Sequence, residues 1–143
     1  MTETVRSRLT LRARLPTTQS AVAVLGGDLL VLFALIAVGQ YTHGYLFWEA
    51  PARTVLITTP FVIGWLLVSP LAGLYSTETL ERYRRTLLFV VPAWVGTSLI
   101  GSALRGSELF PGGAPVVFVL VNIGTGLLFL IPWRLFVTWL YNR

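Results

Sequence analysis

Asp28 is the side chain whose type and position most strongly suggest chemistry. It interrupts an apolar run that extends from Ala21 to Gly39. If this run crosses a lipid bilayer, Asp28 lies roughly 10 Å below the surface at about 1.5 Å of helix per residue. An acidic group there costs about 2.5–3.5 kcal/mol to insert. It is therefore either a protonation site or ion ligand facing a cavity, or an acid paired with a cation that holds two helices together.

Arg134 is the expected partner of Asp28. It lies in the last apolar segment, roughly 10 Å from the same side of the membrane. A nearby opposite charge keeps both groups ionised, so the two would form an intramembrane polar pair. Alternatively, Arg134 extends to the lipid headgroups beside Trp133. The sequence leaves both interpretations open.

A second polar cluster is expected at the other side of the membrane, the outer one. His43, Glu49 and Arg105 are assigned to that side, together with Arg53 and Glu108. Because histidine titrates near neutral pH, this cluster is either pH-responsive or built around a histidine that is simply solvated.

Small and polar residues in the last two apolar segments predict close helix packing. Ser98 and Ser102 lie one turn apart beside Gly101, and such small faces let helix backbones approach closely. This segment is expected inside the bundle or at a dimer interface. Asn122 is expected to hydrogen-bond between helices rather than to form a catalytic site.

No catalytic or cofactor motif is present in the sequence. The chain has no cysteine and a single histidine, which excludes disulfides, thiolate zinc and a multi-histidine metal site. The glycines around Thr125 lack the strand context of a nucleotide-binding loop. We therefore expect neither enzymatic activity nor a cofactor.

The composition predicts an integral membrane protein. Of the 143 residues, 55 % are hydrophobic and only 12 % are charged, against about 25 % charged in soluble domains. The mean hydropathy is +0.73. The net charge of +5 comes from arginines that flank apolar segments. Lipid is therefore the expected partner, and nucleic acid is not.

Four segments are long enough to cross the bilayer as helices, because about 20 apolar residues suffice and no water is present to satisfy the backbone of any other structure. The continuous apolar runs also lack the alternation of strands. We predict an all-α integral membrane bundle, with a basic tail at 1–18 and a four-helix domain at 19–143. Its spans are predicted at about 19–40, 52–75, 86–104 and 115–141.

The arginines predict the orientation. With the N-terminus inside, nine of eleven arginines fall on the inner side, and only Arg53 and Arg105 fall on the outer side. This bias follows the positive-inside rule. A multi-pass protein of the cell membrane with both termini in the cytoplasm is expected.

The connecting segments suggest how the helices are grouped. Residues 44–51 and 106–115 each contain Gly, Leu-Phe and an Ala-Pro that opens the next helix. This similarity is either a tandem duplication of a helical hairpin or convergent loop composition. In the charged connection 76–85, Glu78 and Glu81 are spaced to face Arg82 and Arg85 on a helical turn. Tyr75 is expected as an interfacial anchor.

The order of these motifs resembles an uncharacterised membrane family of archaea and actinobacteria, domain of unknown function 3054. The resemblance covers nearly the whole chain after the N-terminal tail. The chain departs from the family pattern at Gln40, where the family tends to have arginine, and at Pro132, where the family usually has glycine. It implies a four-helix membrane protein and supplies no reaction, cofactor or partner. The residues that carry it are Gly27-Asp28-Leu29-Leu30, Gly39 with His43-Gly44, Thr59-Pro60-Phe61 with Gly64, Leu104-Arg105 and Trp133-Arg134.

Two functions are compatible with these features. The first is a non-enzymatic membrane protein that works by association, as a homo-oligomer or as a subunit of a larger membrane complex. The second is a proton-coupled transporter of an ion or small molecule in which Asp28 titrates. Transport would require at least a dimer, because one four-helix bundle encloses little volume.

Overall fold

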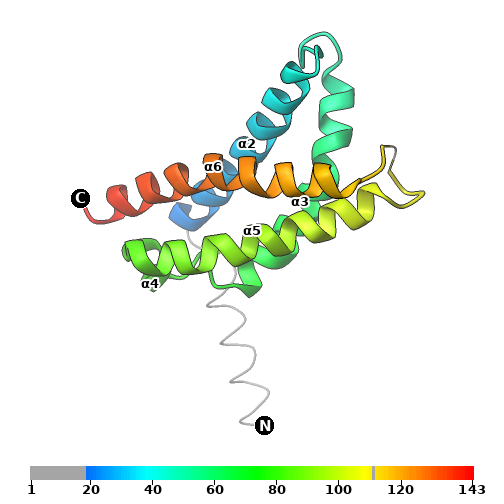
Figure 1. The fold of residues 1–143 in the computed structure, drawn as a ribbon. Helices are drawn as coiled ribbons and strands as arrows, with labels where there is room; N and C mark the ends of the chain where they lie inside the picture. The colour runs from blue at the N-terminus through cyan, green and yellow to red at the C-terminus, as the bar shows by residue number, and fades with distance from the viewer. Residues whose placement is uncertain (1–18, 111) are drawn as a thin grey trace.

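The protein is all-helical over the described residues, which are 19–110 and 112–143 of a computed structural model. Figure 1 shows the arrangement. Four of the helices are long and apolar enough to cross a membrane, which identifies a multi-pass membrane protein. The basic tail predicted at residues 1–18 lies outside the described residues. The helices are α2 (Gln19–Thr42), α3 (Pro51–Leu71), α4 (Thr77–Glu81), α5 (Tyr83–Arg105) and α6 (Val116–Tyr141).

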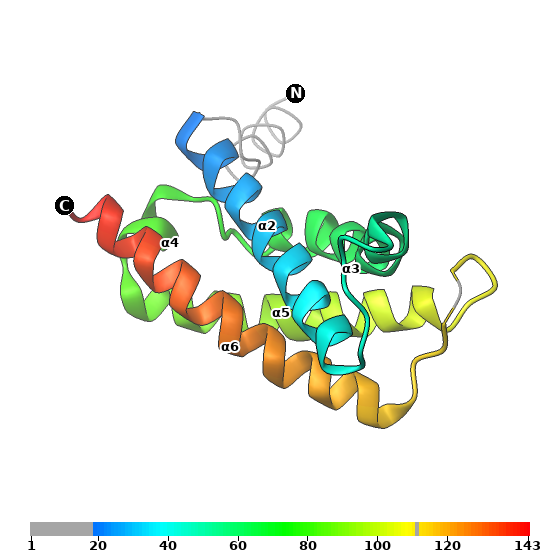
Figure 2. The same cartoon turned by 90° about the horizontal axis from the view of Figure 1, so that it is seen from above.

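The four long helices form two antiparallel hairpins that cross at an angle. Helices α5 and α6 lie side by side, and α2 crosses over them, as Figure 2 shows. Helix α3 packs mainly against α5. The turn between α2 and α3 stands apart from the turn between α5 and α6 in both views. The bundle therefore has one end where the hairpins separate. We call it the His43 end, and we call the opposite end the Asp28 end.

Helix α3 ends earlier than the sequence predicts. The predicted span continued to residue 75, but the helix stops at Leu71. Gly73 adopts a positive φ of 74°, which a residue without a Cβ reaches without strain. The backbone N–H of Leu74 then donates to the carbonyl of Ser69 at 3.2 Å. This turn directs the next two residues back into the bundle, so Leu74 and Tyr75 are buried.

The connection between the two hairpins contains the short helix α4. The hydroxyl of Ser76 accepts a hydrogen bond from the backbone N–H of Thr79 and so caps the helix. Glu78 forms an ion pair with Arg85, at an N···O distance of 3.1 Å, rather than with Arg82 one turn away, because the helix is interrupted between α4 and α5. Both side chains are substantially exposed, so this pair adds little stability.

Three helices meet around buried aromatic side chains. Phe61 and Trp65 of α3 and Trp94 of α5 are fully buried. A Cβ added at Gly101 would collide with the ring of Phe61, and one added at Gly126 would collide with Trp94. These glycines therefore allow α5 to approach α3 and α6 closely. Gly101 of α5 is therefore packed inside the chain.

Candidate functional site

The Asp28 carboxylate is the centre of the candidate site. It is fully buried and forms a two-point ion pair with Arg134, which is 1 % exposed. The Nε of Arg134 donates to Oδ1 at 3.0 Å, and Nη2 donates to Oδ2 at 2.8 Å. Two parallel bonds of this kind are among the strongest polar contacts in proteins. Arg134 is therefore a partner of Asp28 and does not extend to the headgroups.

Two further side chains donate to the same carboxylate. The indole N–H of Trp133 donates to Oδ1 at 2.8 Å, and the hydroxyl of Tyr75 donates to Oδ2 at 2.7 Å. We call Asp28, Tyr75, Trp133 and Arg134 the Asp28 cluster. Each carboxylate oxygen accepts two hydrogen bonds, which compensates the cost of burying the charge.

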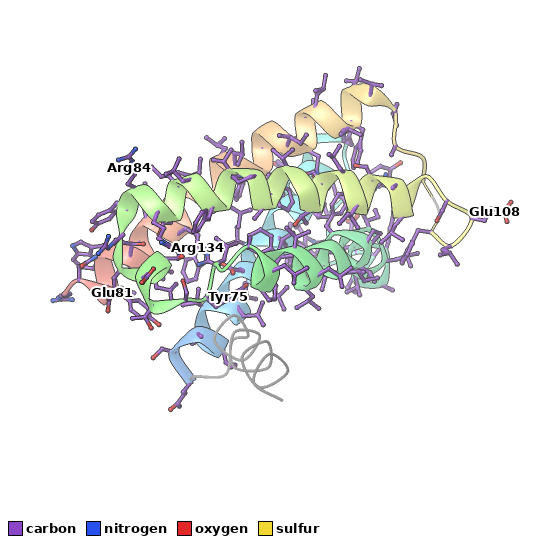
Figure 3. All side chains as sticks on the ribbon, turned by 90° about the horizontal axis from the view of Figure 1, so that it is seen from below. Tyr75, Glu81, Arg84, Glu108 and Arg134 are labelled. Carbon is purple, nitrogen blue, oxygen red and sulfur yellow. The ribbon has the colours of Figure 1, made fainter. Side chains whose placement is uncertain are left out.

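The Asp28 cluster also forms hydrogen bonds to two surrounding residues, Leu74 and Trp65, which we call its outer partners. The Nη1 of Arg134 donates to the carbonyl of Leu74 at 3.0 Å. The indole N–H of Trp65 donates to the hydroxyl of Tyr75 at 3.1 Å. The Asp28 cluster and its outer partners thus join α2, α3, the turn after α3, and α6. Figure 3 shows Tyr75 and Arg134 within the bundle, whereas Arg84 points away from it.

Local sequence places these four side chains together. Trp133 and Arg134 are adjacent in α6, so a single turn of helix presents both to α2. Gly27 lies next to Asp28, and a Cβ at that position would overlap the ring of Trp133. Gly27 therefore allows the indole to reach the carboxylate.

Sequence reasoning misses two members of the cluster, Trp133 as a donor to Asp28 and Tyr75. Tyr75 is predicted as an interfacial anchor, but it is 5 % exposed and lies against Asp28. Burial, and then the negative charge of Asp28, raise the pKa of Tyr75 well above its usual value. The hydroxyl therefore stays protonated as a donor. The glycine two residues earlier is the sequence signal that the chain turns back there.

A cavity of about 380 Å³ lies at the His43 end. His43 and Arg105 both line it, as expected for the outer cluster, and Arg53 and Gln40 line it too. Glu49 does not line the cavity and is exposed. The predicted cluster thus retains its basic members and loses its acid.

Asp28 is separated from this cavity. The residues of α2 that line it begin at Leu35, seven residues and therefore roughly 10 Å beyond Asp28. Asn122 lines it from α6 while its amide donates to the hydroxyl of Ser98 at 2.9 Å. That bond joins α5 to α6, the role expected for both residues.

The remaining predicted packing residue is Ser102, which is buried in α5. Its hydroxyl has no hydrogen-bond partner within the part of the chain that the structure describes. Across residues 19–110 and 112–143, no three Cys, His, Asp or Glu side chains lie close enough together to hold a metal ion.

Comparison with known proteins adds a family to this geometry. No curated protein and no solved structure matches the chain. A family model described as "Protein of unknown function (DUF3054)" matches residues 25–137. This range contains the entire Asp28 cluster and all the residues that line the cavity. The chain therefore belongs to the DUF3054 family.

Proposed function

We propose that this chain is a non-enzymatic membrane protein that works by association, as a homo-oligomer or a subunit of a membrane complex. In this proposal the Asp28 cluster stabilises the fold and carries no protons. The observation that supports it most directly is the environment of Asp28. The carboxylate accepts four hydrogen bonds, two of them from a guanidinium, so its acceptor positions are occupied by protein donors.

A proton-coupled mechanism would require Asp28 to change its protonation state at an accessible site. Protonation would remove the charge that compensates Arg134, leaving a buried guanidinium without a counterion. Asp28 also lies apart from the cavity. Both features disfavour the transporter alternative.

Association is supported by glycines on the outward faces of the outer helices. Gly26 of α2 and Gly124 of α6 are exposed, and nothing lies within 4 Å of a Cβ added at either position. Glycine costs a helix about 1 kcal/mol relative to alanine. Such residues provide close approach to a second helix within a bilayer.

Reconstitution into liposomes separates association from transport. Neither the wild type nor Asp28→Asn should produce a proton flux when a pH gradient is applied. In lipid nanodiscs, the wild type should have the mass of more than one 15.8 kDa chain. Gly26→Leu and Gly124→Leu should reduce that mass, whereas Ala103→Leu on α5 should not. A wild-type flux that Asp28→Asn abolishes would contradict the proposal, and so would a monomeric wild type that copurifies with no other membrane protein.

We also propose that the chain lies in the cell membrane with both termini in the cytoplasm. The described arginines support this orientation, because the Asp28 end carries Arg82 between α4 and α5 and Arg84 and Arg85 in the first turn of α5. The chain has no cysteine, so single cysteines can be introduced directly. An impermeant thiol reagent should label Glu49→Cys in intact cells and should label Glu81→Cys only after lysis. The reverse pattern would overturn the orientation.

A further inference from the structure

We propose that the cavity at the His43 end binds a small anionic amphiphile, a molecule with a carboxylate or phosphate head and an apolar tail. The cavity volume of about 380 Å³ lies within the range of small-ligand pockets. This inference is independent of the association proposed above, because it concerns a different part of the bundle.

The cavity has an uncompensated positive charge. Arg53 at the start of α3 and Arg105 at the end of α5 both line it, with His43 beside them. The two guanidinium charges are close enough to repel one another. No acidic residue lines the cavity, and neither arginine forms an ion pair within residues 19–110 and 112–143. An anion placed between them would relieve the repulsion.

Both arginines are held in place by contacts that leave charge available. The guanidinium of Arg53 lies 3.9 Å from the centre of the Tyr45 ring. The guanidinium of Arg105 lies 4.4 Å from the centre of the Phe118 ring, and its Nε donates to the carbonyl of Gly113 at 2.9 Å. Neither Nη group of Arg105 has a hydrogen-bond partner among the described residues. These Nη groups can therefore bind an oxyanion.

The acidic residues nearest in sequence do not neutralise this charge. Glu49 is exposed in the connection between α2 and α3, outside the cavity lining. Glu108 lies at the tip of the connection between α5 and α6 and points away from the bundle in Figure 3. Neither acidic residue therefore compensates the positive charge of the cavity.

The rest of the cavity wall selects a ligand with an apolar part. Hydrophobic side chains from three helices line it: Leu35 and Ile36 of α2, Ile57 of α3, and Phe118 and Phe129 of α6. A bare hydrated anion would leave these surfaces in contact with water. An apolar tail covers them and gains free energy in proportion to the apolar area removed from water.

Binding is tested with probes that separate the head from the tail. The full chain is purified in a neutral detergent, and its thermal unfolding midpoint is measured with decanoate, decyl phosphate, decanol or inorganic phosphate. Decanoate and decyl phosphate should raise the midpoint, and decanol and inorganic phosphate at the same concentration should not. Equal stabilisation by decanol, or by inorganic phosphate alone, would overturn the proposal.

Arginine variants locate the site. Arg53→Gln and Arg105→Gln should each weaken the apparent affinity for decanoate about tenfold, as expected for the loss of one charge-assisted contact. Arg84→Gln is the matched control, because Arg84 is exposed and does not line the cavity. Arg53 is itself exposed, so the unfolding midpoint of Arg53→Gln without ligand should match that of the wild type. Equal weakening by Arg84→Gln would show a general effect of surface charge and contradict the site.

The two sources of such a ligand are separated by competition. In nanodiscs of phosphatidylcholine, added phosphatidylglycerol should displace decanoate if the ligand is a membrane lipid. If it does not displace decanoate, the amphiphile reaches the cavity from the aqueous phase. Both results support an anionic amphiphile. Loss of decanoate binding in nanodiscs of phosphatidylcholine alone, a lipid with no net charge, would contradict recognition of an anion.

Discussion

Each oxygen of the Asp28 carboxylate accepts two hydrogen bonds. Oδ1 accepts from Trp133 and from the Nε of Arg134, and Oδ2 accepts from Tyr75 and from the Nη2 of Arg134. An ionised carboxylate accepts about four hydrogen bonds at most, so this one has no remaining capacity for an ion or substrate. This saturation supports the proposal that Asp28 is a structural group.

The hydroxyl of Tyr75 can be removed without changing the shape of the ring. Tyr75→Phe should lower the free energy of unfolding by about 1.5–3 kcal/mol, because one donor to a buried charged group is lost. Tyr41→Phe is the control, since Tyr41 is exposed and its hydroxyl makes no hydrogen bond within the described part of the chain. Unfolding in mixed micelles measures both changes. Equal stability of the two variants would show that the hydroxyl of Tyr75 contributes nothing.

The sequence predicts the ionic part of the cluster but not the rest. Asp28 and Arg134 are opposite charges at similar depth in two apolar segments, and low-dielectric surroundings strongly favour their pairing. Tyr75 lies at the end of an apolar run that continues past the helix, so composition alone places it in the membrane interface. The turn at Gly73 decides its position, and a turn of this kind depends on backbone dihedral angles that hydropathy does not encode.

At the scale of the helix, neighbouring glycines have opposite roles. Gly27 of α2 faces Trp133, and Gly26 faces open space. Similarly, Gly126 of α6 faces Trp94, and Gly124 faces open space. One glycine of each pair allows packing within the chain, and the other leaves an outward surface.

These pairs provide matched variants. Gly27→Ala should lower the free energy of unfolding by about 1–3 kcal/mol. The new methyl group overlaps the Trp133 ring and displaces a donor to Asp28. Gly26→Ala should leave the stability of the isolated chain unchanged or raise it by up to about 1 kcal/mol through helix propensity. Thermal unfolding in detergent measures both. Equal destabilisation by the two substitutions would contradict the packing described here.

The number and order of the four long helices could be predicted from hydropathy, whereas their ends, their crossings and the short helix α4 could not. Bilayer thickness requires segments of about 20 apolar residues, which defines four helices. Helix α5 begins at Tyr83, earlier than the predicted residue 86, because its charged first turn continues the helix. The separation of the hairpins at the His43 end depends on side-chain packing that no single segment specifies.

At the scale of the whole molecule, the two ends of the bundle differ. At the Asp28 end, the Asp28 cluster and its outer partners join α2, α3, the turn after α3, and α6. At the His43 end, the helices surround a cavity whose charged lining residues are basic. Glu49 is predicted in a polar cluster with His43 and Arg105, and it lies in the connection at this end but does not line the cavity. Buried polar contacts therefore join four segments at the Asp28 end, and the His43 end contains the cavity that we propose binds a ligand.

A double-mutant cycle on Asp28 and Arg134 tests this account most directly. The free energy of unfolding is measured in mixed micelles for Asp28→Asn, Arg134→Gln and the double variant. Each single variant should lose about 3 kcal/mol or more, because it leaves one buried group without its counterion. The double variant should lose clearly less than the sum of the two. Additivity within about 0.5 kcal/mol would show that the two side chains do not stabilise the fold as a pair.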